Sequence, residues 1–175
     1  MLDWKQQIQV NEEVYHSSDS LIDLTRQDID ELIRKAKLNK RKRIRFCSHK
    51  NTNETVQEML IIHPQDIYVR PHKHLNKIES MLVLHGEVDY FVFSESGEIL
   101  KRIEMGDFES GRSFFHSTRE SFFHSLMIKS EWLVFLEITQ GPFKREDTVF
   151  ADWSPVETEL DEVKKFQHQM KWSHS

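Results

Sequence analysis

Three side chains of metal-ligating type lie close together near the middle of the chain. His72 and His74 are two residues apart, and Glu79 follows five residues later. Residues two apart on a β-strand project from the same face. A hairpin that turns at residues 76–77 would bring Glu79 beside both imidazoles. Two histidines and one carboxylate that converge in this way form a facial triad, which leaves metal positions open for water or substrate.

A fourth ligand is expected from a later strand. His124 alternates with its neighbours so that it shares a face with Leu126 and Ile128, and its side chain should therefore point into the core. His116 lies on the preceding strand and is the competing candidate. A single histidine is more often a surface residue or a hydrogen-bonded core residue than a ligand. The prediction of a metal site depends on the combination of spacing and strand pattern.

A helix precedes the strands that must position these residues. Thr25, followed by Asp28, gives a start that resembles a capping box. Apolar residues then recur at three- and four-residue spacing, from Ile29 to Ala36. This pattern predicts a helix that ends near Asn39 and packs on the main body of the protein.

After residue 40 the hydrophobic period changes to that of β-strands. Short runs rich in apolar and β-branched residues follow one another closely, with no helical pattern between them. This spacing predicts an antiparallel sandwich or a small barrel. Residues 141–155 have the pattern of an extended loop. The predicted strands are 44–48, 55–62, 66–70, 77–85, 88–93, 98–105, 113–116, 122–128 and 132–138.

Composition narrows the classes of function. The chain has 175 residues, with 24 Lys and Arg against 29 Asp and Glu, so its formal net charge is −5. An acidic chain is a poor candidate for nucleic-acid binding. It has no apolar run near the roughly 18 residues that a membrane helix needs, and we expect no secretory signal. The single cysteine, Cys47, fits a reducing cytoplasm and is expected to be a buried, inert thiol.

The motif residues resemble those of a known superfamily. His72, His74, Glu79 and Gly86 match the first cupin motif, although the Pro-x-Gly turn of the second motif is absent before His124. Within the cupins, the chain resembles the WbuC family from about residue 41 to residue 157. The residues that carry this closer resemblance include Arg43, Arg45, Cys47 and His49, the run 68–74, Lys77, Glu137, the run 141–143 and the run 153–157.

The resemblance implies an all-β fold: a cupin double-stranded β-helix, or jelly-roll barrel, with an N-terminal α-helix and a C-terminal extension. The expected division is an extension with the helix at 1–40, the barrel at 41–157 and a tail at 158–175. The tail is either a short helix or disordered. Segment 141–157 should fold back over the barrel or over a partner subunit. A homodimer is expected, since such barrels often pair through sheet edges.

The resemblance also implies the roles of individual residues. His72, His74, Glu79 and His124 would hold a divalent transition metal, namely Fe, Mn, Ni or Zn, at the mouth of the barrel. Arg43 and Arg45 alternate along the chain, so both guanidinium groups could face one side. Together with Arg70 and Lys77 they either form a basic ring that orients an anionic or sugar-related small molecule, or they form a solvated basic edge. His49 or Glu137 would move a proton, with Glu137 either inside the barrel or at its rim.

These roles point first to a metal-dependent enzyme of isomerase or epimerase type. Its substrate would be a small carbohydrate-related or carboxylated molecule in surface-polysaccharide (O-antigen) metabolism, the setting with which the WbuC family is associated. Two alternatives stay open: a non-catalytic cupin that binds a metal or a sugar, and an iron-dependent dioxygenase. The fold alone does not separate them. A cytoplasmic protein that binds neither nucleic acid nor membrane is expected.

Overall fold

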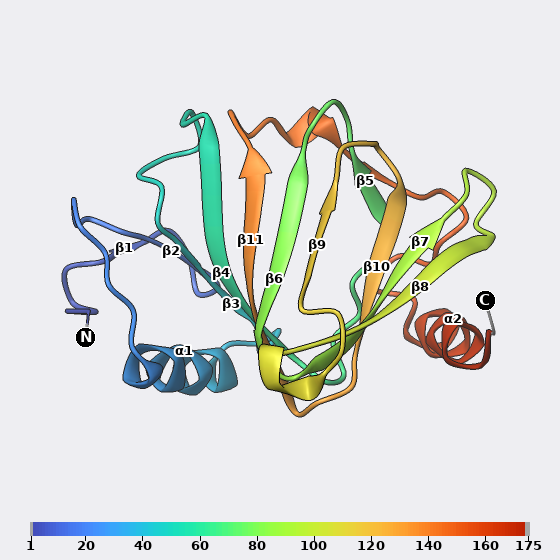
Figure 1. Ribbon diagram of the computed structural model, residues 1–175, viewed down its shortest axis with the longest axis horizontal. Coiled ribbons are helices and arrows are strands. Elements are labelled where there is room, and N and C mark those ends of the chain that lie inside the picture. Colours follow the sequence, from blue (N-terminus) through green and yellow to red (C-terminus); the bar gives the residue numbers. More distant parts are fainter. Residues whose placement is uncertain (1, 174–175) are drawn as a thin grey trace.

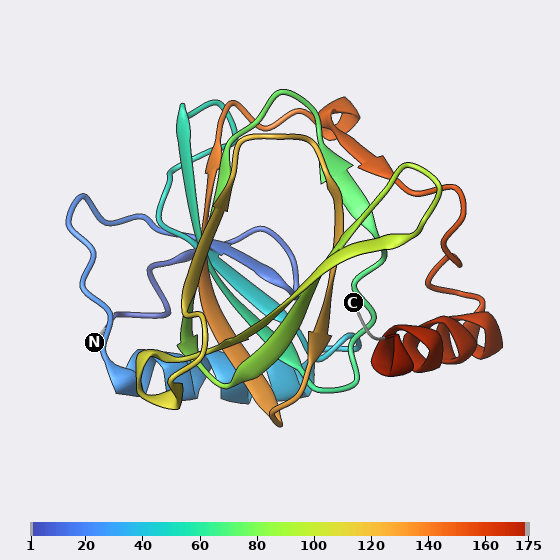
Figure 2. The same ribbon diagram turned by 45° about the vertical axis from the view of Figure 1, so that its right-hand side comes forward.

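Two β-sheets face each other and enclose the interior of a barrel (Figures 1 and 2). The computed structural model describes residues 2–173. The larger sheet has the strand order β1-β2-β3-β4-β11-β6-β9, and the smaller one has the order β12-β5-β10-β7-β8. Neighbouring strands are antiparallel except β2 and β3, which are parallel. The predicted all-β barrel is confirmed.

The strands of the larger sheet are β1 (Ile8–Gln9), β2 (Val14–His16), β3 (Ile44–Cys47), β4 (Val56–Pro64), β6 (Glu79–His85), β9 (Phe115–Thr118) and β11 (Trp132–Gln140). The strands of the smaller sheet are β5 (His72–His74), β7 (Glu87–Phe93), β8 (Ile99–Gly106), β10 (Phe123–Ile128) and β12 (Thr148–Phe150). The helices are α1 (Arg26–Leu38) and α2 (Leu160–Trp172), with short 3₁₀ turns η1 (Phe108–Ser110) and η2 (Arg145–Asp147).

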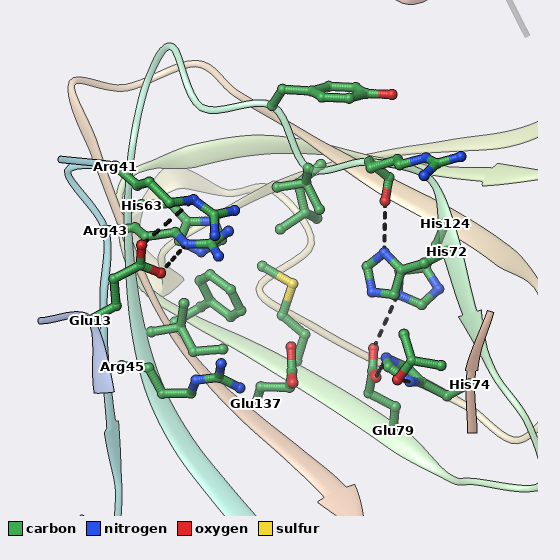
Figure 3. A pocket seen from close by; sticks show the side chains of 18 of the residues that line it. Glu13, Arg41, Arg43, Arg45, His63, His72, His74, Glu79, His124 and Glu137 are labelled. Atoms are coloured by element: carbon green, nitrogen blue, oxygen red, sulfur yellow. Dashed lines mark hydrogen bonds and ion pairs between the residues drawn. The ribbon is translucent and has the colours of Figure 1, made fainter. Parts of the chain in front are cut away.

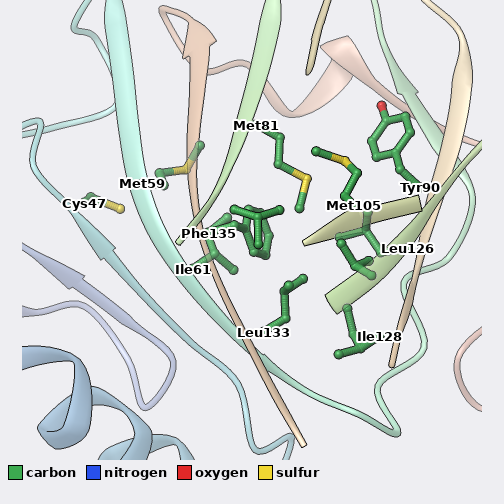
Figure 4. Close-up of a cluster of buried hydrophobic side chains, with 12 residues drawn as sticks. Cys47, Met59, Ile61, Met81, Tyr90, Met105, Leu126, Ile128, Leu133 and Phe135 are labelled. Atoms are coloured by element: carbon green, nitrogen blue, oxygen red, sulfur yellow. The ribbon is translucent and has the colours of Figure 1, made fainter. Parts of the chain in front are cut away.

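The main hydrophobic core fills the space between the sheets (Figure 4). It forms because alternate residues of each strand face inward, as the period of two requires. Leu126 and Ile128 of β10 belong to it, as their shared face with His124 predicts. The buried members are Cys47, Met59, Ile61, Met81, Val83, Val88, Tyr90, Met105, Leu126, Ile128, Leu133 and Phe135.

Helix α1 covers the outer face of the larger sheet beside β3 and β4 (Figure 2). Its predicted start is confirmed, since the carboxylate of Asp28 accepts a hydrogen bond from the Thr25 backbone N–H at 2.9 Å. Leu32 and Ala36 are completely buried and pack against residues of β3 and β4 such as Phe46. The apolar stripe in the sequence therefore predicts both the helix and the face that it buries.

The C-terminal extension folds back over the smaller sheet, as expected. Ala151 N donates to Pro71 O at 2.9 Å, and β12 pairs with β5. Helix α2 then places Phe166 and Met170 against an aromatic cluster on the outer face of that sheet. Of the two alternatives for the predicted tail, the described part is a helix. Residues 174 and 175 of that tail lie outside the described residues, and the residue limits of the three predicted parts remain a prediction.

Two parts of the strand prediction were wrong. Residues 66–70 form no strand; instead, Tyr68 donates to Pro155 O and Arg70 donates to Ser154 Oγ, so this segment is held by the C-terminal extension through side chains. Residues 148–150, expected as loop, form β12. The short strands β1 and β2 near the N-terminus had too few apolar residues for their period to be read.

Gly86 makes the tight turn between β6 and β7. Its φ of +92° lies in the region that side chains other than that of glycine rarely adopt. A Cβ atom at this position would also lie 2.3 Å from Trp132 O. The glycine of the predicted motif is therefore required by the backbone, because it lets β6 turn directly into the next strand.

No helix within residues 2–173 is long and apolar enough to cross a membrane.

Candidate metal centre

Three imidazoles meet at one end of the barrel interior (Figure 3). His72 on β5 is the register partner of His124 on β10, and His74 lies two residues further along β5. One ligand nitrogen from each ring lies within 4.8 Å of the other two. The ring centroids of His72 and His124 are 4.5 Å apart, and those of His72 and His74 are 5.1 Å apart. The structure thus brings together the three histidines that the sequence singles out.

Hydrogen bonds fix which nitrogen of each ring faces the cluster. His72 Nδ1 lies 2.8 Å from Arg70 O, and His124 Nδ1 lies 3.1 Å from Phe122 O. His74 Nδ1 lies 3.2 Å from Thr148 Oγ1. An Nδ1–H that donates to a carbonyl leaves the lone pair on Nε2, which is the usual arrangement of a metal-bound histidine. The backbone therefore prepares the Nε2 atoms of His72 and His124 as donors.

Glu79 reaches the cluster from the opposite sheet. Its Oε2 lies 3.2 Å from His74 Nε2, and its Oε1 lies 3.6 Å from His124 Nε2. The expected hairpin within one sheet is wrong: β5 belongs to the smaller sheet and β6 to the larger one, and the turn between them crosses the mouth of the barrel. Asn76, with a φ of +56°, makes that turn. The carboxylate meets the imidazoles across the interior, as ligands of a barrel site do.

Burial controls the protonation of the three histidines. It lowers the pKa of His72 to about 3, with a further contribution from His124. It lowers the pKa of His124 to about 3 and that of His74 to about 4, each with a contribution from a neighbouring imidazole. The rings are therefore neutral at pH 7, which is the state in which imidazole binds a metal.

Glu79 is the acidic counterpart of this cluster. Only 4% of the residue is exposed, and its Oε2, although 3.2 Å from His74 Nε2, accepts no hydrogen bond from the described residues. Burial raises the pKa of Glu79 well above its usual value, and the nearby carboxylate of Glu137 raises it further. A buried carboxylate oxygen without a partner is costly. A cation held between Glu79 and the imidazoles would remove that cost.

The donor set fits a transition metal. Imidazole nitrogen and carboxylate oxygen are the ligands that iron, manganese, nickel and zinc accept, and four such ligands leave positions open in an octahedral sphere. The residues present therefore fit the metal that the sequence analysis predicts. Geometry and ligand type leave the choice among these ions open.

The metal centre opens into a cavity of about 490 Å³, a size typical of small-molecule sites. Figure 3 shows the imidazoles and Glu79 on one side of it and an arginine-rich wall on the other. Glu137 lies between the two groups, because β11 runs between β4 and β6. The charged and imidazole side chains in the lining are Glu13, Arg41, Arg43, Arg45, His63, Arg70, His72, His74, Glu79, His124, Glu137, Arg145 and Glu157.

The arginines of this wall differ in what already binds them. Arg43 Nε donates to Glu13 Oε2 at 2.7 Å, and Arg70 donates to Ser154 Oγ and to Ala151 O. Within residues 2–173, the guanidinium group of Arg45 has one hydrogen-bond partner, the thioether of Met59 at 3.4 Å. Arg145, which stacks on the Phe150 ring, has no side-chain hydrogen bond among the described residues. Arg45 and Arg145 are thus the two guanidinium groups of the cavity with the most donors left for a ligand.

Glu137 on β11 lines the cavity, so of the two positions that the sequence left open, inside the barrel or at its rim, the structure shows the inside. Burial raises the pKa of its carboxyl group, and the positive charge of Arg45 opposes that shift. A carboxyl group with a raised pKa inside a cavity is suited to general acid–base chemistry.

Three predicted site residues lie elsewhere. Lys77 is outside the cavity lining, and its ammonium group donates to Gln140 O and Pro142 O at 3.1 and 2.8 Å. His49 is also outside the lining. His116, the alternative fourth ligand, packs on Tyr90 with the ring centroids 4.0 Å apart, and it is absent from the imidazole cluster. We therefore leave these three residues out of the site.

Sequence reasoning placed Arg45 in the basic ring but gave it no separate role. The strand alternation that puts Arg45 on the same face as Cys47 was visible in the sequence. The sequence does not show which residue binds each arginine, because Glu13, the partner of Arg43, and Ser154, the partner of Arg70, lie far away in the chain.

Comparisons with known proteins agree with this architecture. The sequence profile of a family described as a domain of unknown function (DUF6016) matches residues 24–105. The search of curated proteins gave no match. A structural-genomics protein from Shewanella oneidensis superposes with a TM-score of 0.57 at 10% identity, over 81% of this chain and 94% of that one.

A Klebsiella pneumoniae protein described as having a double-stranded β-helix domain superposes with a TM-score of 0.51 at 14% identity, over 77% of this chain and 99% of that one. At these identities the likeness concerns the fold and not the activity. Together with the two facing sheets and the jelly-roll strand order, it shows that the chain has the cupin fold.

Proposed function

We propose that the protein is a metal-dependent enzyme that acts on a small anionic, carbohydrate-related or carboxylated molecule, by chemistry of the isomerase or epimerase type. The observation that carries this proposal is the content of one cavity: a cluster of three histidines and a carboxylate, the half-buried carboxyl group of Glu137 beside it, and Arg45, an arginine with free donors, opposite. A protein that only bound a metal would need neither the additional carboxyl group nor the arginine.

His72, His74, His124 and Glu79 would hold the metal. When bound, the metal would polarise a carbonyl or hydroxyl oxygen of the substrate as a Lewis acid. The backbone carbonyls of Arg70 and Phe122 keep two of these rings in the required orientation, and such support raises metal affinity in other proteins.

Glu137 would move the proton. As a carboxylate, it would take a proton from the carbon next to a substrate carbonyl, while the electron pair of that C–H bond moves toward the carbonyl oxygen. In an isomerisation it would return the proton to the former carbonyl carbon, while the proton of the adjacent hydroxyl group passes to the former carbonyl oxygen. In an epimerisation it would return the proton to the same carbon after the intermediate has turned its other face to Glu137. Because burial raises its pKa, Glu137 exchanges protons closer to neutral pH than an exposed glutamate does.

Arg45 would bind the anionic group of the substrate. Its guanidinium group shares the cavity with Glu137, and its one hydrogen-bond partner among the described residues is the thioether of Met59. Arginine binds carboxylates and phosphates through two parallel hydrogen bonds. Arg43 and Arg70, the residues expected from sequence, line the same cavity and would add positive potential from the rim.

A role in surface-polysaccharide metabolism is the part of the proposal that comes from the sequence resemblance to the WbuC family. It is supported by the residues quoted for that resemblance, among them Arg45 and Glu137, which share the cavity. The cavity volume also suits a ligand of monosaccharide size.

The proposed function is tested by proton exchange. The metal-loaded protein would be incubated in D₂O with a panel of sugar phosphates, nucleotide sugars and small keto acids, and deuterium uptake at carbon would be followed by NMR. We expect one compound to exchange, and Glu137→Gln to lose the exchange while retaining the metal. Glu109→Gln, at an exposed position, is the control. Tight binding of a compound without any exchange, or unchanged exchange in Glu137→Gln, would contradict the proposal.

A further inference from the structure

A second cluster of ligand-type side chains lies on the larger sheet. His16 ends β2, Cys47 ends β3, and His49 follows two residues later. One ligand atom from each lies within 4.8 Å of the other two. Among the described residues, only this group and the imidazole cluster of the metal centre meet that criterion.

The parallel pairing of β2 and β3 creates the cluster. His16 is the register partner of Cys47, and Tyr15 is the partner of Phe46. Tyr15 and Phe46 pack on the side of helix α1. Because side chains alternate between faces, His16 and Cys47 both turn to the other side of the sheet. Sequence analysis missed His16, since residues 1–20 show no clear strand pattern.

Backbone atoms hold both imidazoles by Nδ1. His16 Nδ1 lies 2.9 Å from His49 O, so it donates there and its lone pair is on Nε2. His49 Nδ1 lies 3.1 Å from Glu58 O and 3.1 Å from Glu58 N, so it either donates to that carbonyl or accepts from that N–H. In the tautomer that donates to this carbonyl, His49 also has its lone pair on Nε2. In that tautomer both rings have the backbone support of His72 and His124, and each has Nε2 free for a ligand. A cation at Nε2 of His49 would select this tautomer over the one in which Glu58 N–H donates to Nδ1.

The cluster is dry. His16, Cys47 and His49 are 9%, 3% and 7% exposed. Burial raises the pKa of the Cys47 thiol to about 11, so without a cation the thiol stays protonated. Two imidazoles and a thiolate are the donors that zinc prefers, whereas manganese prefers oxygen. A bound thiophilic ion would replace the thiol proton and supply the positive charge that a buried thiolate needs.

The cluster is separate from the metal centre. None of its residues lines the cavity. Cys47 pairs with Met59 of β4, which pairs with Glu137 of β11, so two strand spacings, roughly 10 Å, lie between Cys47 and Glu137. We propose that His16, Cys47 and His49 bind Zn²⁺ at a second site, which ties the N-terminal strand β2 to β3 and to the segment after it.

Cobalt titration tests this site with a readout that the metal centre does not give. Co²⁺ is a spectroscopic substitute for Zn²⁺, and a thiolate bound to Co²⁺ gives charge-transfer absorption in the near ultraviolet. Cys47 is the single cysteine of the chain, so such a band in the monomeric protein arises from it alone. We expect the band in the metal-free protein after Co²⁺ addition, and its loss when Zn²⁺ is added.

Variants separate the two sites. The double variant His72→Ala/His74→Ala should keep the cobalt–thiolate band, and Cys47→Ser should lose it. His16→Asn keeps a donor for His49 O but lacks Nε2, so it should weaken Zn²⁺ binding at this site by about 100-fold or more, beyond the 10–100-fold effect of an outer-sphere partner. Circular dichroism would verify that each variant is folded.

Two results would overturn the second site. One is a wild-type protein that binds Co²⁺ at the metal centre without any thiolate band. The other is a band of unchanged strength and affinity in folded His16→Asn. Neither result tests the assignment of the metal centre. That assignment would be contradicted if the His72→Ala/His74→Ala variant retained all of its metal.

Discussion

Acid should unfold the metal-free protein through its buried imidazoles, and His124 allows the effect to be measured at one residue. His124 is 6% exposed, and burial lowers its pKa from 6.5 to about 3. In the unfolded chain the ring takes up a proton near pH 6.5, whereas in the folded protein it resists protonation until about pH 3. The neutral ring therefore costs no stability above pH 6.5, and the folded state loses stability as the pH falls below that value.

The size of the loss follows from the gap between these values. Each pH unit below 6.5 favours the protonated, unfolded chain by about 1.4 kcal/mol. At pH 5 the folded ring is still neutral, so His124 alone should lower the free energy of unfolding by roughly 2 kcal/mol relative to pH 7. Bound metal holds the neutral form and should suppress the loss.

Urea denaturation measures this effect. The free energy of unfolding of the chelator-treated protein would be determined at pH 7 and pH 5, for the wild type and for His124→Asn, which retains a donor for Phe122 O. The loss between the two pH values should be about 2 kcal/mol smaller in the variant. His85→Asn, at an exposed histidine, should keep the wild-type loss. An equal loss in wild type and His124→Asn would show that His124 is solvated, and would refute the buried cluster.

Other predictions concern single positions. Gly86→Ala should lower the free energy of unfolding by about 2 kcal/mol or more, because of its positive φ and the contact with Trp132 O; thermal denaturation would reveal it, and a variant as stable as wild type would contradict the turn geometry. Lys77→Met should cost about 1–3 kcal/mol through its lost carbonyl and carboxylate contacts, yet leave metal content unchanged; a lost metal equivalent would restore Lys77 to the site. Glu79→Gln should weaken metal binding in calorimetry, but less than His72→Ala, since an amide oxygen still ligates; unchanged affinity would exclude Glu79.

The parts of the fold that the sequence predicts are those with a local signal. The capping residues Thr25 and Asp28 mark the start of α1, and the alternation around His124 places it in line with Leu126 and Ile128. The motif glycine Gly86 marks a turn because its backbone conformation suits no other residue as well.

What the sequence does not predict depends on contacts between distant segments. Whether His72 and Glu79 share a sheet depends on how β5 pairs, and β5 pairs with β12, which itself has no clear strand pattern. The sequence did not show that Lys77 and His49 lie outside the site for the same reason. Lys77 contacts Pro142 and His49 contacts Glu58, and tertiary packing brings these partners together. The homodimer and the cytoplasmic location stay predictions.

Metal content tests the central claim most directly. Wild-type protein and His72→Ala/His74→Ala would be stripped, loaded separately with Mn²⁺, Fe²⁺, Ni²⁺ and Zn²⁺, desalted and measured by elemental mass spectrometry. The variant should hold one equivalent less than the wild type of whichever ion the centre binds, while its circular dichroism stays that of a β-barrel, because the centre lies at the mouth and not in the core. Equal metal content in the two proteins, for every ion, would contradict a metal centre at these histidines.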